Sequence, residues 1–244
     1  DMPGYGLTGA PENPDDFSEQ NIINTFAKFV DELKLERVSL AGNSLGGFVA
    51  AQYAAQNPGR VDKLILLDPF GYPQDTPWIL GLGTFAPVAF LGNYIQPPLL
   101  VTLNLRWVYG DPRRLRDEDQ FRYVHMNQRP GAKPIYVKTL KIIEARSKNT
   151  DPLPFHRIAA PTLLMWGEED WWVPPGIASK WLADIPNAKL VTYPGVGHIP
   201  MEEIPADTLR DALRFLQEGL KPFASTPPAD QPISWQQRLL DEAA

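Results

Sequence analysis

Residues 38–50 read VSLAGNSLGGFVA and contain the pattern Gly-x-Ser-x-Gly at Gly42–Gly46. The residues before the pattern, 37–41, predict a short buried strand, and residues 48–55 predict an alanine-rich helix. By itself the pattern also fits an ordinary glycine-rich turn. Between a strand and a helix, however, it forms a sharp turn, the nucleophile elbow, which carries the serine clear of the sheet. We therefore expect Ser44 to act as a nucleophile.

Further apolar runs alternate with helical patterns along the chain. Residues 61–67 form a nearly continuous apolar run, as in parallel strands covered on both faces, and residues 162–166 and 189–192 are similar. Helices are predicted from Asp15 or Asp16 to about residue 35, over residues 174–182 and over residues 206–216. Strands that alternate with helices predict an α/β fold with a mostly parallel sheet.

Residues 69–155 interrupt this alternation with many prolines and no strand–helix repeat, and they predict an inserted lid of short helices. Residues 76–105 carry no charge, but glycines and prolines interrupt this run and disfavour a membrane span. The run either packs as the interior of the lid or lines an apolar pocket over the nucleophile. The expected domains are residues 1–68 and 156–221 as two parts of an α/β core, 69–155 as the lid, and 222–244 as a proline-rich linker and tail.

Composition narrows the classes of partner and cofactor. The formal charge of −6 and the absence of a Lys/Arg stripe disfavour nucleic acid as a partner. The chain has no cysteine, which excludes disulfides and thiolate catalysis and is compatible with a cytoplasmic location. Its three histidines are scattered, so we expect neither a histidine-rich metal site nor a cofactor. The expected ligand is a small-molecule substrate.

A serine hydroxyl needs a base that takes its proton and an acid that orients the base. His198 is the best candidate base, because it lies in a glycine-rich loop after the last predicted strand, where α/β sheets place their ligands. His125 and His156 lie in or beside the predicted lid, and we interpret both as surface or structural residues.

Two aspartates follow predicted strands and are candidates for the orienting acid. Asp170 follows the strand that ends near Trp166, and Asp68 follows the strand that ends at Leu67. We favour Asp170 and keep Asp68 as the alternative acid. With Asp170, the order of the three residues along the chain is serine, acid, histidine. One fold of serine hydrolases has this order, and it differs from the orders in the two serine protease folds.

Four segments together resemble the α/β-hydrolases, in particular the lid-bearing esterases and C–C hydrolases. The segments are Asp1-Met2-Pro3-Gly4-Tyr5-Gly6, Gly42-Asn43-Ser44-Leu45-Gly46-Gly47, Trp166-Gly167-Glu168-Glu169-Asp170 and Gly197-His198-Ile199-Pro200-Met201-Glu202. The resemblance spans about residues 1–220. It implies that Ser44 is the nucleophile, His198 the general base and Asp170 its partner. It also implies that Leu45, at the start of a helix, donates one N–H to the oxyanion hole.

The resemblance also predicts a segment before Asp1. In the family this segment supplies the first strands and a loop that donates the second oxyanion N–H. Loss of one oxyanion donor typically lowers the rate by about 10²–10³-fold, and without those strands the elbow strand becomes an edge of the sheet. We therefore expect the α/β-hydrolase fold to be incomplete at its N-terminus. The chain is a fragment of a longer protein, pairs with a separate chain that holds the missing segment, or is a truncated inactive product.

The reaction expected first is hydrolysis of a carboxylic ester with an apolar acyl or aryl part, through an acyl-enzyme. A serine at position 44 disfavours the relatives that use an aspartate nucleophile. The sequence 43–47 is similar to that of enzymes that cleave aromatic ring-fission products, but those usually have an aromatic residue soon after the histidine. Here Ile199 and Pro200 follow. C–C hydrolysis is therefore the alternative, a perhydrolase or haloperoxidase is a more distant one, and a binding module or inactive fragment with little turnover is kept as a different class.

Overall fold

The computed structural model describes residues 1–220, so the predicted linker and tail at 222–244 lie outside the described residues. The chain divides into two compact units. Unit 1 contains residues 1–36, 71–105 and 116–152, and unit 2 contains residues 37–70, 106–115 and those from 153 onward.

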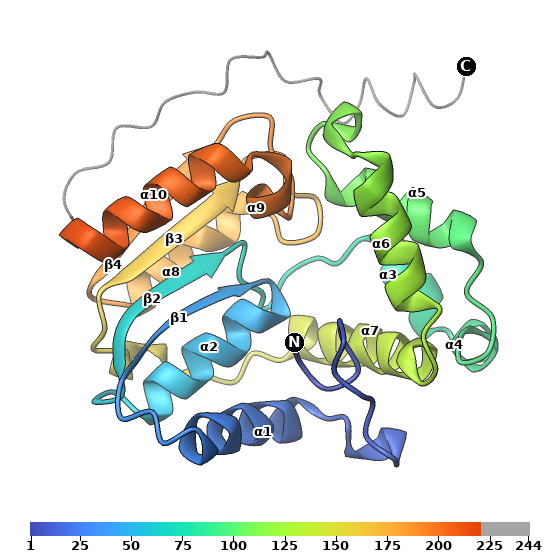
Figure 1. Cartoon of the computed structure of the whole chain (residues 1–244), viewed down its shortest axis with the longest axis horizontal. Helices are drawn as coiled ribbons and strands as arrows, with labels where there is room; N and C mark the ends of the chain where they lie inside the picture. The colour runs from blue at the N-terminus through green and yellow to red at the C-terminus, as the bar shows by residue number, and fades with distance from the viewer. Residues whose placement is uncertain (221–244) are drawn as a thin grey trace. The chain divides into compact units, whose positions relative to one another are not determined.

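Unit 2 contains a four-stranded sheet in the order β1-β2-β3-β4, with every neighbouring pair parallel. The strands are β1 (Val38–Asn43), β2 (Val61–Leu67), β3 (Thr162–Gly167) and β4 (Ala188–Tyr193). The α/β fold with a parallel sheet is therefore confirmed. β1, which leads into the elbow, is an edge strand of this sheet (Figure 1). The prediction that this strand is buried was wrong, because an edge strand has a neighbour on one side only and none of the residues of β1 is buried.

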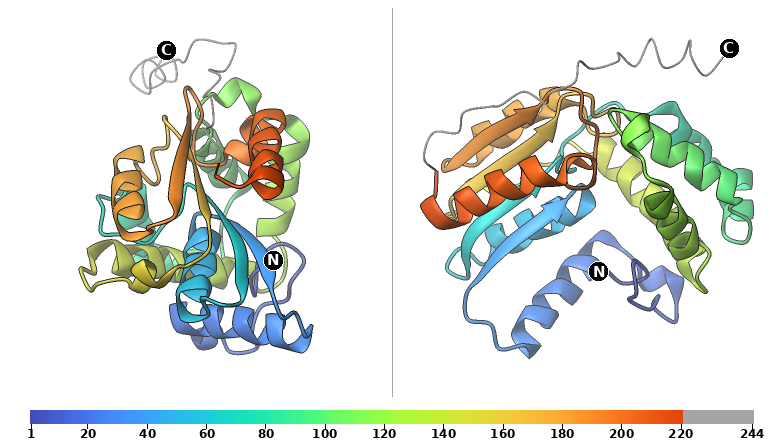
Figure 2. Two further views of the ribbon diagram at one scale, coloured as in Figure 1. Left: turned by 90° about the vertical axis from the view of Figure 1, so that its left-hand side faces the viewer. Right: turned by 45° about the horizontal axis from the view of Figure 1, so that its top comes forward.

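Helices cover both faces of the sheet, so its central strands are buried on both sides. They are α2 (Leu45–Gln56), α8 (Ala178–Asp184), α9 (Pro200–Glu203) and α10 (Pro205–Glu218), with short 3₁₀ turns at Pro112–Arg114, Pro154–Arg157 and Pro175–Ile177. Figure 2 shows α8 and α10 on opposite sides of the sheet. On the α8 side, Phe155 stacks on Trp181 with ring centroids 4.6 Å apart and meets Phe48 of α2 edge-on.

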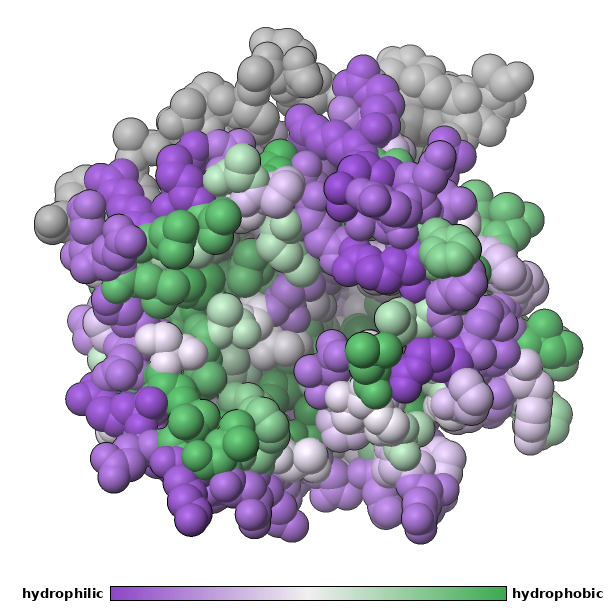
Figure 3. Space-filling model, in the orientation of Figure 1, coloured by the Kyte–Doolittle hydropathy of each residue, from purple (hydrophilic) through white to green (hydrophobic). Residues whose placement is uncertain are grey.

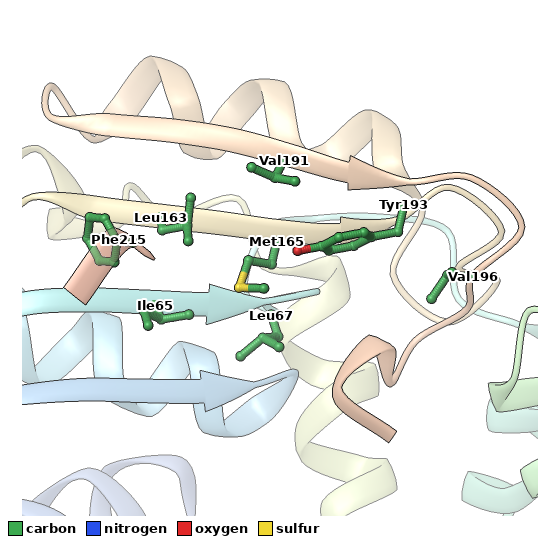
Figure 4. Close-up of a cluster of buried hydrophobic side chains, with 8 residues drawn as sticks. All are labelled: Ile65, Leu67, Leu163, Met165, Val191, Tyr193, Val196 and Phe215. Atoms are coloured by element: carbon green, nitrogen blue, oxygen red, sulfur yellow. The ribbon is translucent and has the colours of Figure 1, made fainter. Parts of the chain in front are cut away.

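On the α10 side, alternate residues of the strands build one apolar cluster. Figure 4 shows this cluster, which consists of Ile65, Leu67, Leu163, Met165, Val191, Tyr193, Val196 and Phe215. Successive strand residues point to opposite faces, which is why the odd-numbered positions of β2, β3 and β4 meet here. The cluster fixes the strand ends from which the loops with the candidate site residues emerge.

Unit 1 is helical. Its helices are α1 (Glu19–Glu32), α3 (Trp78–Thr84), α4 (Ala86–Gly92), α6 (Asp117–Asn127) and α7 (Ala132–Lys148), preceded by a 3₁₀ turn at Pro14–Asp16, and α5 (Pro98–Val108) begins in this unit. Short helices thus occupy the region that the prolines marked as an insertion.

The first 36 residues belong to this helical unit, whereas the sequence placed them with the core as part of residues 1–68. Several contacts join these residues to α7. The Tyr5 hydroxyl bonds the Thr139 hydroxyl, and Glu19 pairs with Arg146 at 3.3 Å. The division of the chain into the four expected domains remains a prediction.

Three helices begin three or more residues away from the predicted start. One is α8, which begins at Ala178 rather than at residue 174, because Pro175–Ile177 forms a 3₁₀ turn. α1 begins at Glu19, because the Ser18 side chain accepts the N–H of Asn21 as its N-cap, whereas Asp15 and Asp16 belong to the preceding 3₁₀ turn. α2 begins at Leu45, directly after the elbow serine, rather than at Phe48.

The uncharged run at residues 76–105 forms α3, α4 and the start of α5, and many of its large apolar side chains are exposed. They are Trp78, Leu82, Phe85, Val88, Phe90, Leu91, Tyr94, Ile95, Leu99 and Leu100. Figure 3 shows hydrophobic side chains along the edge where α4 and α5 lie. Within residues 1–220, no helix has both the length and the apolar character that a membrane span needs.

Candidate active site

Ser44 lies at the turn between β1 and α2 with φ 51° and ψ −120°, a conformation that residues other than glycine rarely adopt. Three backbone hydrogen bonds hold it there. Its N–H donates to the carbonyl of Leu67, and its own carbonyl accepts the N–H groups of Phe48 and Phe70. The side chain makes no capping bond to α2. The hydroxyl is therefore presented from a fixed backbone, as in a nucleophile elbow.

Close backbone contacts explain the glycine at position 42. A Cβ there would collide with the backbone of Gly46 and Gly47, because α2 turns directly back over the end of β1. The N–H of Leu45 lies in the first turn of α2, where backbone N–H groups have no partner within the helix. Its role as an oxyanion donor, and that of a second donor before Asp1, remain predictions.

Asn43 joins the elbow to the loop that carries His198. Its Nδ2 donates to the carbonyl of Leu67 at 3.0 Å and to the carbonyl of His198 at 2.9 Å. No role for this side chain was predicted, because it occupies a variable position of the Gly-x-Ser-x-Gly pattern. An amide with two N–H donors can bridge two carbonyls, and here it fixes the histidine loop against the elbow.

His198 and Asp170 form a buried pair, with 2.7 Å between Nδ1 of the imidazole and Oδ2 of the carboxylate. An ionised carboxylate only accepts hydrogen bonds, so the proton of a neutral His198 lies on Nδ1. Nε2 is then free to accept a proton. No hydrogen bond joins the Ser44 hydroxyl to His198 within the described residues, and such bonds are often formed only with substrate bound.

The second oxygen of Asp170 fixes its own loop after β3. Oδ1 accepts the N–H groups of Trp172 at 2.8 Å and Val173 at 3.0 Å. Trp166 Nε1 donates to the carbonyl of Val173 at 3.0 Å, which ties the loop back to the strand. The carboxylate that faces His198 therefore has one defined orientation.

Asp68 lies at the end of the neighbouring strand β2 and is fully buried. Its Oδ1 accepts the N–H of Gly167 at 2.8 Å. Burial and the negative charge of Asp170 raise the pKa of the Asp68 carboxyl well above its usual value, although the hydrogen bond from Gly167 acts in the opposite direction. The two candidate acids thus lie together, and Asp170 is the one that bonds His198.

Glu203 is a buried acid that was not among the predicted site residues. Its Oε2 accepts the N–H groups of Gly110 and Gly197, both at 2.8 Å, and its Oε1 accepts the N–H of Asp111 at 2.7 Å and Arg114 Nη1 at 3.1 Å. Burial raises the pKa of Glu203, while these N–H groups and the Arg114 charge lower it. Because each oxygen of Glu203 accepts two hydrogen bonds, the geometry fits the ionised carboxylate.

The carboxylate of Glu203 joins the loop that carries His198 to residues 106–115. This segment does not follow a strand of the sheet, but it helps to hold the histidine loop in place. His198 also donates its N–H to the carbonyl of Val108 at 2.8 Å. The available signal for Glu203 was an acid five residues after the histidine, among Ile199, Pro200 and Ile204. An acid in such apolar surroundings indicates a buried carboxylate with specific partners.

The other two histidines are outside this cluster. His125 is exposed on α6, where its Nδ1 lies 2.9 Å from the carbonyl of Phe121, and His156 is also exposed. Within residues 1–220, no group of three or more His, Cys, Asp or Glu is arranged to hold a metal ion.

Comparison with known proteins identifies the family. The sequence profile of the alpha/beta hydrolase fold family matches residues 1–205. The chain belongs to the α/β hydrolase fold family. A curated relative, the 2-hydroxy-6-oxononadienedioate/2-hydroxy-6-oxononatrienedioate hydrolase of Cupriavidus pinatubonensis, is 30% identical over 201 residues, which cover 81% of this chain and 68% of the relative.

Solved structures of α/β hydrolases have the same fold. A meta-cleavage product hydrolase from Pseudomonas fluorescens IP01 aligns with a TM-score of 0.75 and 23% identity, covering 89% of this chain and 78% of that one. A thermophilic esterase from Thermogutta terrifontis aligns with a TM-score of 0.72 and 23% identity, covering 91% and 79%. At these identities the likeness shows the α/β-hydrolase fold.

Proposed function

We propose that this α/β hydrolase is a serine hydrolase that cleaves carboxylic esters with an apolar acyl or aryl group. Ser44 is the nucleophile, His198 the general base and Asp170 the acid that orients it. The observation that carries the proposal is the buried 2.7 Å pair of His198 and Asp170, fastened through Asn43 to the elbow of Ser44. This arrangement supplies the base and orienting acid that a serine hydroxyl needs.

The reaction proceeds in two halves. Ser44 Oγ attacks the carbonyl carbon as His198 Nε2 takes its proton, and the Leu45 N–H stabilises the oxyanion. The intermediate collapses to an acyl-serine, and the departing alcohol takes the proton from His198. Water, deprotonated by His198, then attacks the acyl carbon, and Ser44 regains its proton as the acid is released. One ester and one water give one acid and one alcohol.

The choice of an ester and the choice of an apolar group each rest on one feature. Ile199 and Pro200 follow His198, and Ile199 is buried, so the position after the base carries no exposed aromatic ring. The apolar acyl or aryl group is proposed because the sequence predicts a lid over residues 69–155, and residues 76–105 of this lid carry no charge.

Hydrolysis of a C–C bond in a ring-fission product is the second candidate. It is favoured by curated relatives named as 2-hydroxy-6-oxo-dienoate-type hydrolases, at 26–30% identity. The same three residues serve this reaction, but the leaving group is a carbon and must receive a proton there.

Paired assays of one preparation test the proposal. We expect turnover of p-nitrophenyl esters that Ser44→Ala abolishes, and covalent labelling of Ser44 by a fluorophosphonate probe. Faster turnover of a 2-hydroxy-6-oxo-dienoate than of the esters favours the second candidate. A folded protein that neither labels nor turns over either substrate contradicts both candidates and leaves the binding module or inactive fragment.

A further inference from the structure

Asp68 has a polar atom for which the described residues provide no ordinary donor. Its Oδ1 accepts the Gly167 N–H, but its Oδ2 is buried and accepts no hydrogen bond within residues 1–220. Leaving a buried carboxylate oxygen without a donor is costly. A carboxylic acid solves this problem differently, because its O–H is itself a donor.

Asp170 is the acid next to Asp68. Asp68 directly follows β2, and Asp170 lies just beyond the end of the neighbouring parallel strand β3. Both bond the same residue, because Gly167 donates its N–H to Asp68 and its carbonyl accepts the N–H of Asp170. A hydrogen bond between the two carboxyl groups needs a proton on one of them, and burial and the charge of Asp170 favour the protonated form of Asp68. Two ionised carboxylates could not form it, since neither has a donor.

We propose that Asp68 is a positioning residue whose neutral carboxyl group donates its Oδ2–H to the Asp170 carboxylate and holds that carboxylate against His198. Asp68 is then a partner of Asp170 rather than an alternative to it. The positioning role of Asp68 in catalysis rests on the proposed function. The neutral state of its buried carboxyl group does not depend on that function.

The charged groups around Asp68 favour its neutral form. Asp170 and Glu203 both place negative charge toward it and raise its pKa, in addition to burial. The cationic partner of Glu203 is Arg114, and the partner of Asp170 is His198. Neither pairs with Asp68. Two carboxyl groups in one buried site commonly share a proton for the same reason.

Stability as a function of pH tests the neutral acid without any turnover. The pKa of Asp68 is higher in the folded than in the unfolded chain, so above about pH 4 the unfolded chain releases a proton that the folded chain retains. The free energy of unfolding of the wild type therefore decreases as the pH rises toward the pKa that Asp68 has in the folded chain. Asp68→Asn cannot titrate. We expect its melting temperature, relative to wild type, to increase steadily from pH 4 toward neutral pH and above.

Infrared spectroscopy detects the proton directly. We expect the carboxylic-acid C=O stretch of a buried acid in wild type at neutral pH, and its loss in Asp68→Asn. Asp211→Asn is the control, since Asp211 is buried in the same unit but pairs with Arg210, and it should keep the band. A spectrum without this band, or a melting difference that is flat or falls with pH, overturns the proposal.

Kinetics test the positioning role. Asparagine keeps an acceptor for Gly167 and an N–H donor for Asp170, and it tolerates the φ of 43° at this position, so Asp68→Asn should retain most of the turnover. Asp68→Ala and Asp68→Gly remove the donor, and each should lower kcat by about tenfold with little change in KM. Glycine also adopts the positive φ at this position without strain. Equal losses of kcat in the alanine and glycine variants therefore assign the effect to the hydrogen bond and not to the backbone.

The outcomes separate the two proposals. If Asp68→Asn loses as much kcat as Asp68→Gly, the donor role is wrong, whether or not the esterase assay succeeds. If wild type does not label with fluorophosphonate, the proposed function fails, while the infrared band and the pH dependence of stability still decide the state of Asp68.

Discussion

The strand-end cluster of unit 2 and the uncharged helices of unit 1 differ in what they bury. In the first region, Asp68 and Asp170 follow β2 and β3 and Glu203 ends α9; all three acids are buried, and nearly every polar atom of their carboxyl groups has a defined partner. In α3, α4 and α5, large apolar side chains are exposed. Buried polar groups persist only with specific partners, whereas exposed apolar side chains make few specific contacts. We therefore expect substitutions to have large effects in the first region and small effects in the second.

The largest expected effect is that of Ser44→Ala. Removing a nucleophile from a unit of three cooperating residues lowers kcat by about 10⁶-fold. Alanine has no γ-oxygen, so ester turnover should fall to background while the far-ultraviolet circular dichroism is unchanged. Residual turnover above one per cent of wild type would falsify the assignment of the nucleophile.

Asp170→Asn should lower kcat by about 10⁴-fold, because the amide cannot act as the negative acceptor that holds the His198 tautomer. The matched comparison is Asp68→Asn, which leaves the bond between Asp170 and His198 in place. If Asp68→Asn damages kcat more than Asp170→Asn does, the assignment of the orienting acid is wrong.

Glu203→Ala tests whether the cluster depends on its partners. It leaves the N–H groups of Gly110, Asp111 and Gly197 without their acceptor and Arg114 without its carboxylate. We expect the free energy of unfolding to fall by about 3 kcal/mol, measured by urea denaturation. Glu203→Gln keeps the volume and one acceptor oxygen, so its loss should be smaller; equal losses would show that packing, and not the acceptor, matters here.

The smallest effect is expected in the uncharged helices. Leu99 is 66% exposed on α5, so Leu99→Ala should change the free energy of unfolding by less than about 0.5 kcal/mol. Leu66→Ala is the matched control, because Leu66 is fully buried in β2 and its truncation should cost about 2–5 kcal/mol. A large loss at Leu99 would mean that the exposed face is covered when the protein is in solution.

Short-range patterns predicted the sheet and the strand-end positions well. The apolar runs predicted the positions of all four strands. Burial on both faces explains the nearly continuous apolar sequence of β2 and β3, whereas β1 has no buried residue. The start of α1 was misplaced, because several residues can act as N-caps and only the local geometry selects Ser18. The grouping of residues 1–36 with α7 was also not predicted. It depends on contacts such as that between Tyr5 and Thr139, which are far apart in sequence.

The parallel α/β fold and the candidates Ser44, Asp68, Asp170 and His198 could be predicted from short stretches of sequence, because turn chemistry and apolar periodicity act over a few residues. The tertiary structure decided which acid bonds His198, and it brought in Asn43 and Glu203. Those relations join residues up to 155 positions apart, and the hydrogen bonds form only after the sheet has aligned the strand ends. Burial, which makes Asp68 a neutral acid beside Asp170, is likewise a property of the packed sheet and not of any short segment.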